Sequence, residues 1–440
     1  MVLQFIDISN LVSTLKEYLI MKILNEELKE ILDLWNIKPE IKKKISRMLD
    51  ENPPEKPVHL FRYYCPEEKN DKVSRLEKVF ARKFGSKYAL AVNSGTSALI
   101  TSLVACGVGP GDEVIVPAYT FFASASAVVV AKAIPVIAEI DETLTIDPSD
   151  IEKKITPRTR AIIPVHMRGL PCNMDSIMKI AKKHRLSVIE DTAQAAGGTF
   201  RGKKLGTFGD TGCFSFDAYK IIASGEGGMV TTDSEKIYVR AQSWHDTAAC
   251  WRPNRYERER MQGELFCGEN YRLSQVQGAI ALAQMKKLDG YLSRLRKNKK
   301  MLSEYLEGRI GNFSLSPVHD AKGDCSTGLI LLAPEGREAK DKIARMKKKG
   351  IPAGGIYDQT VRDWHIYKFW EHILQKKTPT EEGCPFTCPY YRGKLPVYSQ
   401  DMCPETLGIL DRVINIAINE DWTKSEIKTL AKKITETASD

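Results

Sequence analysis

Hydrophobic positions divide the chain into a helical start and a longer part in which strands and helices alternate. Apolar residues recur every three or four positions over 11–35 and again over 41–49. This spacing predicts two amphipathic helices, and Pro39 should end the first because proline lacks a backbone donor and crowds the preceding turn. We therefore expect residues 1–56 to form a helical N-terminal extension that packs on the body of the protein or on a partner subunit.

Beyond this extension, short apolar runs rich in β-branched residues alternate with helical patterns. The expected strands are Ala89–Val92, Glu113–Val116, Val136–Ile140, Ala161–Val165, Ser187–Glu190, Gly212–Phe216 and Met229–Thr232. Such alternation predicts an α/β fold, a mostly parallel sheet with helices on both faces. We expect this large domain over 57–290, a long helix near Gln275–Lys299 that leads out of it, and a smaller C-terminal α+β domain over 291–440.

Composition narrows the class of protein. The chain has 440 residues, of which 42% are hydrophobic and 28% charged, and these values are ordinary for a globular enzyme. No stretch approaches about 18 uninterrupted apolar residues, and the start of the chain has neither a basic flank nor a cleavage site. We therefore expect a cytoplasmic protein without a membrane span. The net charge of +9 suits phosphorylated or acidic metabolites.

Neither the basic runs nor the cysteines predict a further ligand. The basic runs at 294–300 and 347–349 lie in helical patterns, which favours solvated faces over nucleic-acid binding. The ten cysteines follow no repeated spacing, and Cys384, Cys388 and Cys403 lack a fourth ligand at motif spacing. We expect reduced thiols, no metal site and no nucleic-acid partner.

The strongest chemical signal is Lys220, which precedes the glycine-rich turn at 225–228. Earlier in the chain, Asp191 ends the apolar run at 186–190. A carboxylate at the end of a buried strand, followed by a lysine before a glycine-rich turn, indicates a site for pyridoxal 5′-phosphate (PLP). The lysine forms a Schiff base with the PLP aldehyde. The carboxylate keeps the pyridine nitrogen protonated, so that the ring can act as an electron sink.

Two further segments follow predicted strands, at the ends where α/β proteins bind ligands. The segment 93–99, with Gly95 and Thr96, opens an apolar helix and is either a phosphate-binding turn or an ordinary helix cap. Phe121 follows the next strand and either stacks on a planar cofactor or belongs to the core.

Three more polar residues are candidates for the same site. Gln194 lies three residues beyond Asp191 and could hydrogen-bond the phenolic oxygen of the cofactor. Ser215 lies five residues before Lys220 and could donate to the phosphate. Asn270 begins a segment that either caps the following helix or contributes to the active site.

Together these segments resemble the DegT/DnrJ/StrS group of PLP-dependent sugar aminotransferases, which have fold type I of the PLP enzymes. The resemblance runs from about Phe61 to the C-terminus and rests on the order and spacing of the motifs. The motifs are Asn93-Ser94-Gly95-Thr96, Pro117-Ala118-Tyr119-Thr120-Phe121, Glu190-Asp191-Thr192-Ala193-Gln194, Ser215-Phe216 with Lys220, Gly225-Glu226-Gly227-Gly228, and Asn270-Tyr271-Arg272 followed by Gln277-Gly278-Ala279.

The resemblance implies a role for each candidate residue. Lys220 would hold the cofactor covalently, and Asp191 would pair with its pyridine nitrogen. The other implied contacts are Gln194 to the ring oxygen, Phe121 to the ring face, Gly95, Thr96 and Ser215 to the phosphate, and Asn270 to the phosphate of the neighbouring subunit. Members of the group are dimers with shared active sites, so the resemblance also implies a homodimer.

The resemblance extends to the substrate. Segments 166–169, 363–367 and 402–406 are similar to the branch that aminates 3-deoxy-octulosonate, an eight-carbon sugar acid. If the chain acts like that branch, Arg168 pairs with the sugar carboxylate and His365 contacts sugar hydroxyls. The expected reaction moves an amino group from an amino acid, L-glutamate, to a keto-sugar, either 8-oxo-3-deoxy-octulosonate or a nucleotide-linked keto-sugar.

Alternatives to this function and substrate stay open. The chain departs from the octulosonate branch at Asp217 and over 221–224, so the exact keto-sugar is not fixed. Related PLP-dependent sugar dehydratases carry histidine in place of the lysine, whereas this chain keeps Lys220. A non-catalytic regulator or scaffold on the same fold would have no need of the pair formed by Asp191 and Lys220. These residues favour the transaminase.

Overall fold

The computed structural model describes residues 23–53, 60, 70–247, 258–259 and 263–439. By its internal contacts the chain divides into two compact units, Met1–Asp71 and Lys72–Asp440. None of the described helices is long and apolar enough to cross a membrane.

Two helices form the described part of the N-terminal unit. They are α2 (Asn25–Asp33) and α3 (Pro39–Glu51). Pro39 is the first residue of α3, a position where its missing donor costs no helical hydrogen bond. The two helices are joined by an ion pair of 2.6 Å between Lys29 and Asp50. They match the apolar repeat from residue 24 onward, while the repeat over 11–19 lies outside the described residues.

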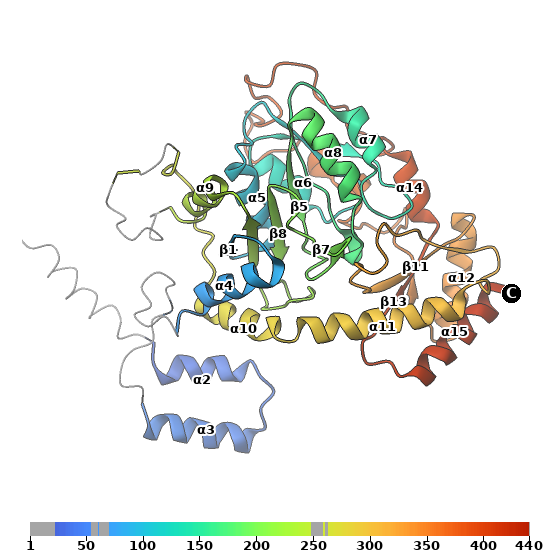
Figure 1. Ribbon diagram of the computed structural model, residues 1–440, viewed down its shortest axis with the longest axis horizontal. Helices are drawn as coiled ribbons and strands as arrows, with labels where there is room; N and C mark the ends of the chain where they lie inside the picture. Colours follow the sequence, from blue (N-terminus) through green and yellow to red (C-terminus); the bar gives the residue numbers. More distant parts are fainter. Residues whose placement is uncertain (1–22, 54–59, 61–69, 248–257, 260–262, 440) are drawn as a thin grey trace, which may run out of the picture. The chain divides into compact units, whose positions relative to one another are not determined.

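A seven-stranded sheet with the order β1-β9-β8-β5-β4-β2-β3 is the centre of the second unit (Figure 1). The strands are β1 (Tyr88–Val92), β2 (Glu113–Pro117), β3 (Ile134–Ala138), β4 (Thr159–Ile162), β5 (Ser187–Asp191), β8 (Thr211–Ser215) and β9 (Gly228–Thr232). All neighbours pair in parallel except β9, which is antiparallel to β1 and β8. The predicted α/β class with a mostly parallel sheet is therefore confirmed.

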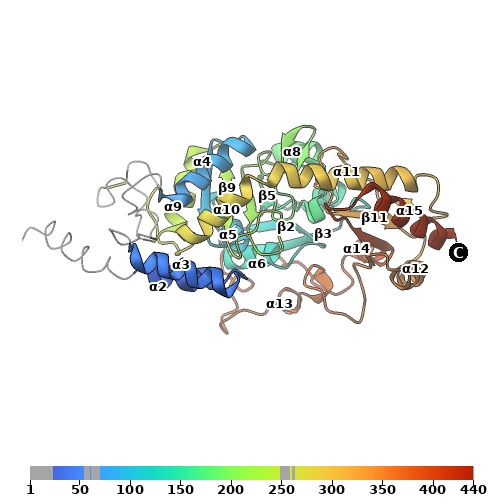
Figure 2. The ribbon, with the colours of Figure 1, turned by 90° about the horizontal axis from the view of Figure 1, so that it is seen from below.

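Helices cover both faces of this sheet, as Figure 2 shows from below. One face carries α5 (Gly95–Ala105), α6 (Ala123–Val130) and α9 (Glu235–His245), and the other carries α4 (Lys72–Phe84), α7 (Pro148–Lys154), α8 (Met174–His184) and α10 (Gln275–Met285). Successive strand residues enter different cores because their side chains alternate between the faces: Ile189 lies in the core under α5, and Val188 in the core under α8. The same alternation separates the two acidic residues that end β5.

The C-terminal part has its own antiparallel sheet, with the order β10-β11-β13-β12. Its elements are β10 (Ser314–Leu315), β11 (Gly328–Leu332), β12 (Ala353–Gly354), β13 (Val413–Ala417), α12 (Gly336–Lys348), α13 (Glu371–Leu374), α14 (Pro404–Asp411) and α15 (Lys424–Ser439). Two one-turn 3-10 helices, η3 (Met167–Gly169) and η4 (Tyr367–Phe369), and the short hairpin β6 (Thr199–Phe200) and β7 (Lys203–Lys204) complete the unit. The predicted boundary between 57–290 and 291–440 stays a prediction, because contacts group 72–440 together.

The long helix predicted near Gln275–Lys299 is two helices in the structure. After α10, a turn at 286–287 precedes α11 (Leu288–Leu306). The first residues of α11, such as Leu292, pack in the core of the large sheet, whereas Leu302 packs in the core of the C-terminal sheet. Two apolar cores in succession keep the hydrophobic spacing continuous across the turn, and this is why the sequence pattern did not reveal the break.

Candidate active site

A cavity of about 410 Å³ lies where β1, β2, β5 and β8 end. Its lining consists of Ser94, Gly95, Thr96, Leu99, Thr120, Phe121, Ala123, Ser124, Val165, Asp191, Ala193, Gln194, Ser215, Asp217, Tyr219, Lys220, Glu226 and His365. The carboxyl ends of strands are the usual ligand sites of α/β sheets. The cavity thus brings together eight of the ten predicted site residues, and among the described residues only Arg168 and Asn270 are missing from its lining.

Asp191 ends β5 and is 6% exposed. The Ser124 hydroxyl donates to its Oδ2 at 2.8 Å, and the Ala193 N–H donates to its Oδ1 at 3.1 Å. Burial raises the pKa of the Asp191 carboxyl, while these two hydrogen bonds and the positive charge of Lys220 oppose the rise. A buried carboxylate with so few donors favours a cationic partner on its cavity side, and a protonated pyridine nitrogen is such a partner.

Glu190 faces away from the cavity and has a full set of donors. Its carboxylate accepts hydrogen bonds from the N–H groups of Gly206, Phe208 and Gly209 at 2.8, 2.6 and 2.8 Å. His166 Nε2 lies 3.1 Å from the same carboxylate, and the Cys172 N–H donates to His166 Nδ1, which places the ring proton on Nε2. This network fixes the end of β5 from the far side of the sheet.

Of the two readings of 93–99, the structure shows the helix cap, and the phosphate-binding turn stays a prediction. Ser94 caps α5 by accepting a hydrogen bond from the Ser97 N–H at 3.0 Å. The N–H groups of Gly95 and Thr96, in the first turn, have no partner within the helix and line the cavity. A β-carbon on Gly95 would lie 2.7 Å from the β-carbon of Ser215, so only glycine lets Ser215 approach. This convergence at a helix N-terminus fits a phosphate group.

Lys220 reaches the cavity from the loop between β8 and β9. The N–H groups of Tyr219 and Lys220 both donate to Asp217 at 3.0 Å, the first to the side chain and the second to the carbonyl. A β-carbon on Gly228 would lie 2.4 Å from the Ser94 carbonyl oxygen. The glycine-rich turn therefore lets β9 pass directly under the start of α5 and keeps Lys220 near the phosphate-binding turn.

Phe121 and His365 form the side of the cavity nearest the C-terminal part. Phe121 is 47% exposed, which excludes its alternative reading as a core residue. Its ring centroid lies 5.3 Å from that of His365. His365 Nδ1 lies 2.7 Å from Asp363 Oδ1. Burial raises the pKa of Asp363, but hydrogen bonds from His365 outweigh burial and lower it. His365 is thus held in one orientation at the cavity wall.

Backbone hydrogen bonds attach the His365 segment to the Phe121 segment. The Thr120 N–H donates to the His365 carbonyl and the Phe122 N–H to the Trp364 carbonyl, both at 2.9 Å. Tyr119 and Ile366 form an isolated β-bridge between the same segments. Residues far apart in the sequence are thereby fixed next to each other.

Gln194 is held by the turn that contains Arg168. The Arg168 N–H donates to Gln194 Oε1 at 3.0 Å. Arg168 itself has a left-handed backbone with φ of 57°, and its guanidinium donates to the Tyr119 hydroxyl at 3.3 Å instead of entering the cavity lining. The pairing of Arg168 with a substrate carboxylate stays a prediction.

Asn270 lies outside the cavity of its own chain. It is exposed, and its Oδ1 accepts a hydrogen bond from the Arg272 N–H at 3.4 Å. Its predicted contact with a neighbouring subunit stays a prediction. No group of three or more His, Cys, Asp or Glu within the described residues could hold a metal ion.

Ser124 is the functional residue that the sequence reasoning missed. It comes from the start of α6, 67 positions before the carboxylate that it contacts. The hydroxyl of Thr120 lies 2.8 Å from the Ser124 hydroxyl and extends the chain of hydrogen bonds. A serine in the first turn of an apolar helix is an ordinary residue, so the sequence carried no signal for this contact.

A model of the DegT/DnrJ/EryC1/StrS aminotransferase family matches residues 67–384. A GDP-perosamine synthase of Caulobacter vibrioides is 42% identical over 251 residues, 56% of this chain and 64% of that protein. An L-glutamine:2-deoxy-scyllo-inosose aminotransferase of Micromonospora echinospora is 38% identical over 53% of this chain and 58% of its own. These matches span less than two thirds of either relative.

The solved structures match over a larger share of the chain. The crystal structure of 3-amino-5-hydroxybenzoic acid synthase superposes with a TM-score of 0.69 and 27% identity, covering 92% of this chain and 98% of its own. An aminotransferase from Psychrobacter cryohalolentis has the same TM-score and identity, with 91% and 97% coverage.

Proposed function

Because the chain belongs to the DegT/DnrJ/EryC1/StrS aminotransferase family, we propose that it is a transaminase that moves an amino group from an amino acid to a keto-sugar. The observation that carries the proposal is the meeting of Asp191, Lys220 and the N-terminus of α5 in one cavity. The cofactor of this family is PLP. The cavity fits the pyridine nitrogen, the aldehyde and the phosphate of PLP, because each has a suitable partner there.

These residues would hold the cofactor at both ends. The first N–H groups of α5 and the Ser215 hydroxyl would bind the phosphate, and the Asp191 carboxylate would pair with the pyridine nitrogen. Phe121 would lie against the ring and exclude water from one face. When bound, PLP supplies an electron sink for negative charge that develops on the substrate carbon.

Lys220 would be the residue that moves the proton. Once the amino donor has displaced Lys220 from the cofactor, its Nζ would be free. It would take a proton from the substrate carbon as a base and deliver a proton to the cofactor carbon as an acid. The hydrogen bonds of Asp217 hold the backbone at 219–220, so the side chain moves while its origin stays fixed. The positive charge of Lys220 also acts on Asp191: it lowers the pKa of that carboxyl, against the rise that burial causes.

The finer proposal is that the acceptor is an acidic keto-sugar such as 8-oxo-3-deoxy-octulosonate. His365 supports a sugar, because its fixed ring can bond hydroxyls from the cavity wall. The sugar carboxylate has fewer suitable partners. Lys220 lines the cavity together with three carboxylates, those of Asp191, Asp217 and Glu226. A sugar carboxylate would therefore need Arg168 to leave Tyr119, or a cation from a second chain. A nucleotide-linked keto-sugar is the alternative.

Spectroscopy and product analysis test the reaction. Adding L-glutamate or L-glutamine to the PLP-loaded protein should shift its visible absorption toward the ultraviolet, and mass spectrometry should find nitrogen added to one member of a keto-sugar panel. A product that has lost oxygen without gaining nitrogen would establish the dehydratase instead. A cofactor-loaded protein whose spectrum responds to no amino donor would establish the scaffold.

Chemical labelling tests the assignment of Lys220. Borohydride reduction of the PLP-loaded protein should fix the cofactor to Lys220, and peptide mapping should find no other labelled lysine. Lys220→Ala should abolish transamination while the fold persists. Lys203→Ala is a matched control, because Lys203 is exposed on β7 and absent from the cavity lining. A label on any other lysine would remove the basis of the mechanism.

We also propose that two chains share each active site, with Asn270 reaching the neighbour's phosphate. The test mixes two inactive variants, Lys220→Ala and Asn270→Asp, under subunit exchange. One site of each mixed dimer then carries both defects and the other neither, so about half of its sites should regain activity. Mixed dimers without regained activity would refute the shared site.

A further inference from the structure

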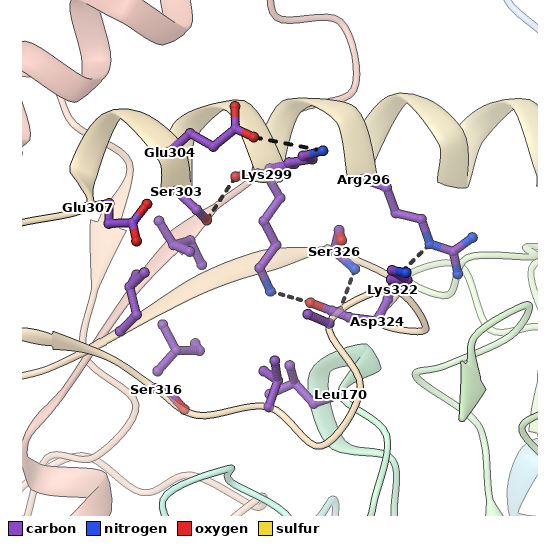
Figure 3. A pocket seen from close by; sticks show the side chains of 16 residues that line it. Leu170, Arg296, Lys299, Ser303, Glu304, Glu307, Ser316, Lys322, Asp324 and Ser326 are labelled. Atoms are coloured by element: carbon purple, nitrogen blue, oxygen red, sulfur yellow. Dashed lines mark hydrogen bonds and ion pairs between the residues drawn. The ribbon is translucent and has the colours of Figure 1, made fainter. Parts of the chain in front are cut away.

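A second cavity, of about 660 Å³, lies between α11 and the C-terminal sheet (Figure 3). It is larger than the catalytic cavity and shares no lining residue with it. One wall is a stripe along α11 from Arg296 to Glu304, continued by Glu307 just after the helix. Its residues repeat at helical spacing and so face the same way. The opposite wall comes from β10, β11 and the loop between them.

Most of the surface that this second cavity exposes is apolar. The apolar side chains are Leu170, Leu315, Val318, Ala321, Leu329 and Ile330. Seven of the sixteen lining residues are charged, and they lie around these apolar side chains. Pockets for small molecules have volumes of roughly 300–1,000 Å³ and apolar walls with placed polar groups, and this cavity falls in that range. The body of a ligand that fits here is therefore apolar.

One end of the cavity carries an excess of positive charge. Arg296, Lys299 and Lys322 gather there around the single acid Asp324, as Figure 3 shows. Lys299 pairs with Asp324, and Arg296 Nε donates to the Asp324 carbonyl at 2.8 Å. Asp324 is 1% exposed and fixed by these contacts. In the part of the chain that the structure describes, no ion pair engages the ammonium of Lys322, so a ligand anion would find an available cation.

The same end touches the turn that holds Gln194 in the catalytic cavity. The Cys325 N–H donates to the Gly169 carbonyl at 3.1 Å, and the Thr327 hydroxyl donates to the Arg168 carbonyl at 2.8 Å. The Arg168 N–H in turn donates to Gln194. A β-carbon on Gly169 would lie 2.7 Å from that of Cys325, so the two segments are packed backbone to side chain. Direct contacts therefore connect 324–327 with Gln194.

We propose that this cavity is a second binding site, for a small molecule with an apolar body and one anionic group, and that its occupancy alters the position of Gln194. The apolar walls receive the body, and Lys322 with Lys299 and Arg296 receives the anion. The basic run at 294–300, which the sequence predicts to be a solvated helix face, is therefore only partly solvated. Lys297 faces solvent, whereas Arg296 and Lys299 face the cavity.

Calorimetry on the cofactor-loaded protein tests the binding. Octanoate should bind once per chain and more tightly than octanol, which has the same body without the charge. Lys322→Glu should weaken the binding of octanoate by about five- to tenfold, because an attraction becomes a repulsion at an exposed position. The affinity for octanol should stay unchanged. The matched control Lys297→Glu lies on α11 outside the cavity and should bind octanoate as the wild type does.

A filled cavity identifies the location. Ser303→Trp places an indole in the cavity from a half-buried position of α11 and should abolish the binding of both probes. The proposal is overturned if the wild type does not bind octanoate or if Ser303→Trp still binds it. It is also overturned if Lys322→Glu and Lys297→Glu bind octanoate with equal affinity.

The cofactor spectrum tests the connection to Gln194. Saturating octanoate should change the visible absorption of the wild-type protein. Thr327→Val removes the hydroxyl that contacts Arg168 and should keep octanoate binding while losing the spectral change. A spectral change that persists in Ser303→Trp would mean that octanoate enters the catalytic cavity, and an unchanged wild-type spectrum would refute the connection.

Discussion

The two faces of the sheet at the end of β5 treat neighbouring carboxylates in opposite ways. On one face, Glu190 has three backbone donors and His166, so the protein itself replaces the water that a buried charge loses. On the other face, Asp191 has one hydroxyl and one backbone donor and lines a cavity. A carboxylate completed by the protein is structural, whereas one left incomplete beside a cavity is available to a ligand.

The largest effect should come from removing the charge on the cavity side. Asp191→Asn should keep the fold and much of the cofactor but lose transamination by hundreds-fold, since an amide cannot keep the pyridine nitrogen charged and a lost contact of this kind costs about 2.7–4 kcal/mol. Steady-state rates measure this. A rate within about threefold of wild type would remove Asp191 from the mechanism.

The matching change on the other face should affect stability. Glu190→Gln keeps the shape but replaces an acceptor of several N–H groups by an amide, which leaves buried donors unsatisfied. We expect a loss of about 2–3 kcal/mol in the free energy of unfolding. Denaturant titration measures it, and the intrinsic rate of the remaining folded protein should fall far less than in Asp191→Asn. Equal losses of rate in both variants would break the contrast between the faces.

Removal of the Ser124 hydroxyl tests the same contrast between Asp191 and Glu190, with a smaller effect on the rate. Ser124→Ala deletes one of the two donors to Asp191 and should slow transamination about tenfold, the equivalent of about 1.4 kcal/mol for a hydrogen bond to a charged group. The acid limb of the pH–rate profile should also move to higher pH, because this hydrogen bond opposes the rise in the Asp191 pKa. Ser126→Ala in the same helix is the control, and an unchanged acid limb would contradict the prediction.

The smallest effect concerns the protein without cofactor. The raised pKa of Asp191 means that the folded state holds its proton more tightly than the unfolded state, whose carboxyl titrates near 3.8. The apoprotein should therefore lose stability as the pH rises from about 3.8 through the pKa of the folded protein. Asp191→Asn lacks this loss and should be more stable than wild type at neutral pH. Paired thermal unfolding curves at several pH values test it, and a variant less stable at every pH would contradict it.

Local sequence patterns were sufficient for the parts of the site that depend on strand ends and turns. Lys220, Asp191, Gly95 and Ser215 follow or end strands, and parallel strands bring their carboxyl ends to one edge. The glycine-rich turn at 225–228 was part of the same local signal, and the structure shows that Gly228 lies directly under Ser94.

The remaining features depend on contacts between distant residues. The bond from Ser124 to Asp191 crosses 67 positions, and no local pattern specifies it. Arg168 has a left-handed backbone, which a non-glycine residue rarely adopts and a sequence does not reveal, and its guanidinium contacts Tyr119 outside the cavity lining. The second cavity exists only because α11 and the C-terminal sheet meet around it.

The backbone bonds between 118–122 and 364–367 bear on how specificity can diversify in such a protein. Main-chain donors and acceptors do not depend on side-chain identity, so these bonds survive exchange of the residue at 365. The wall that we propose to meet the sugar can therefore vary while the aromatic ring at 121 keeps its place. An engineer seeking a new acceptor would thus randomise the C-terminal segment first, and would inherit the cofactor chemistry unchanged.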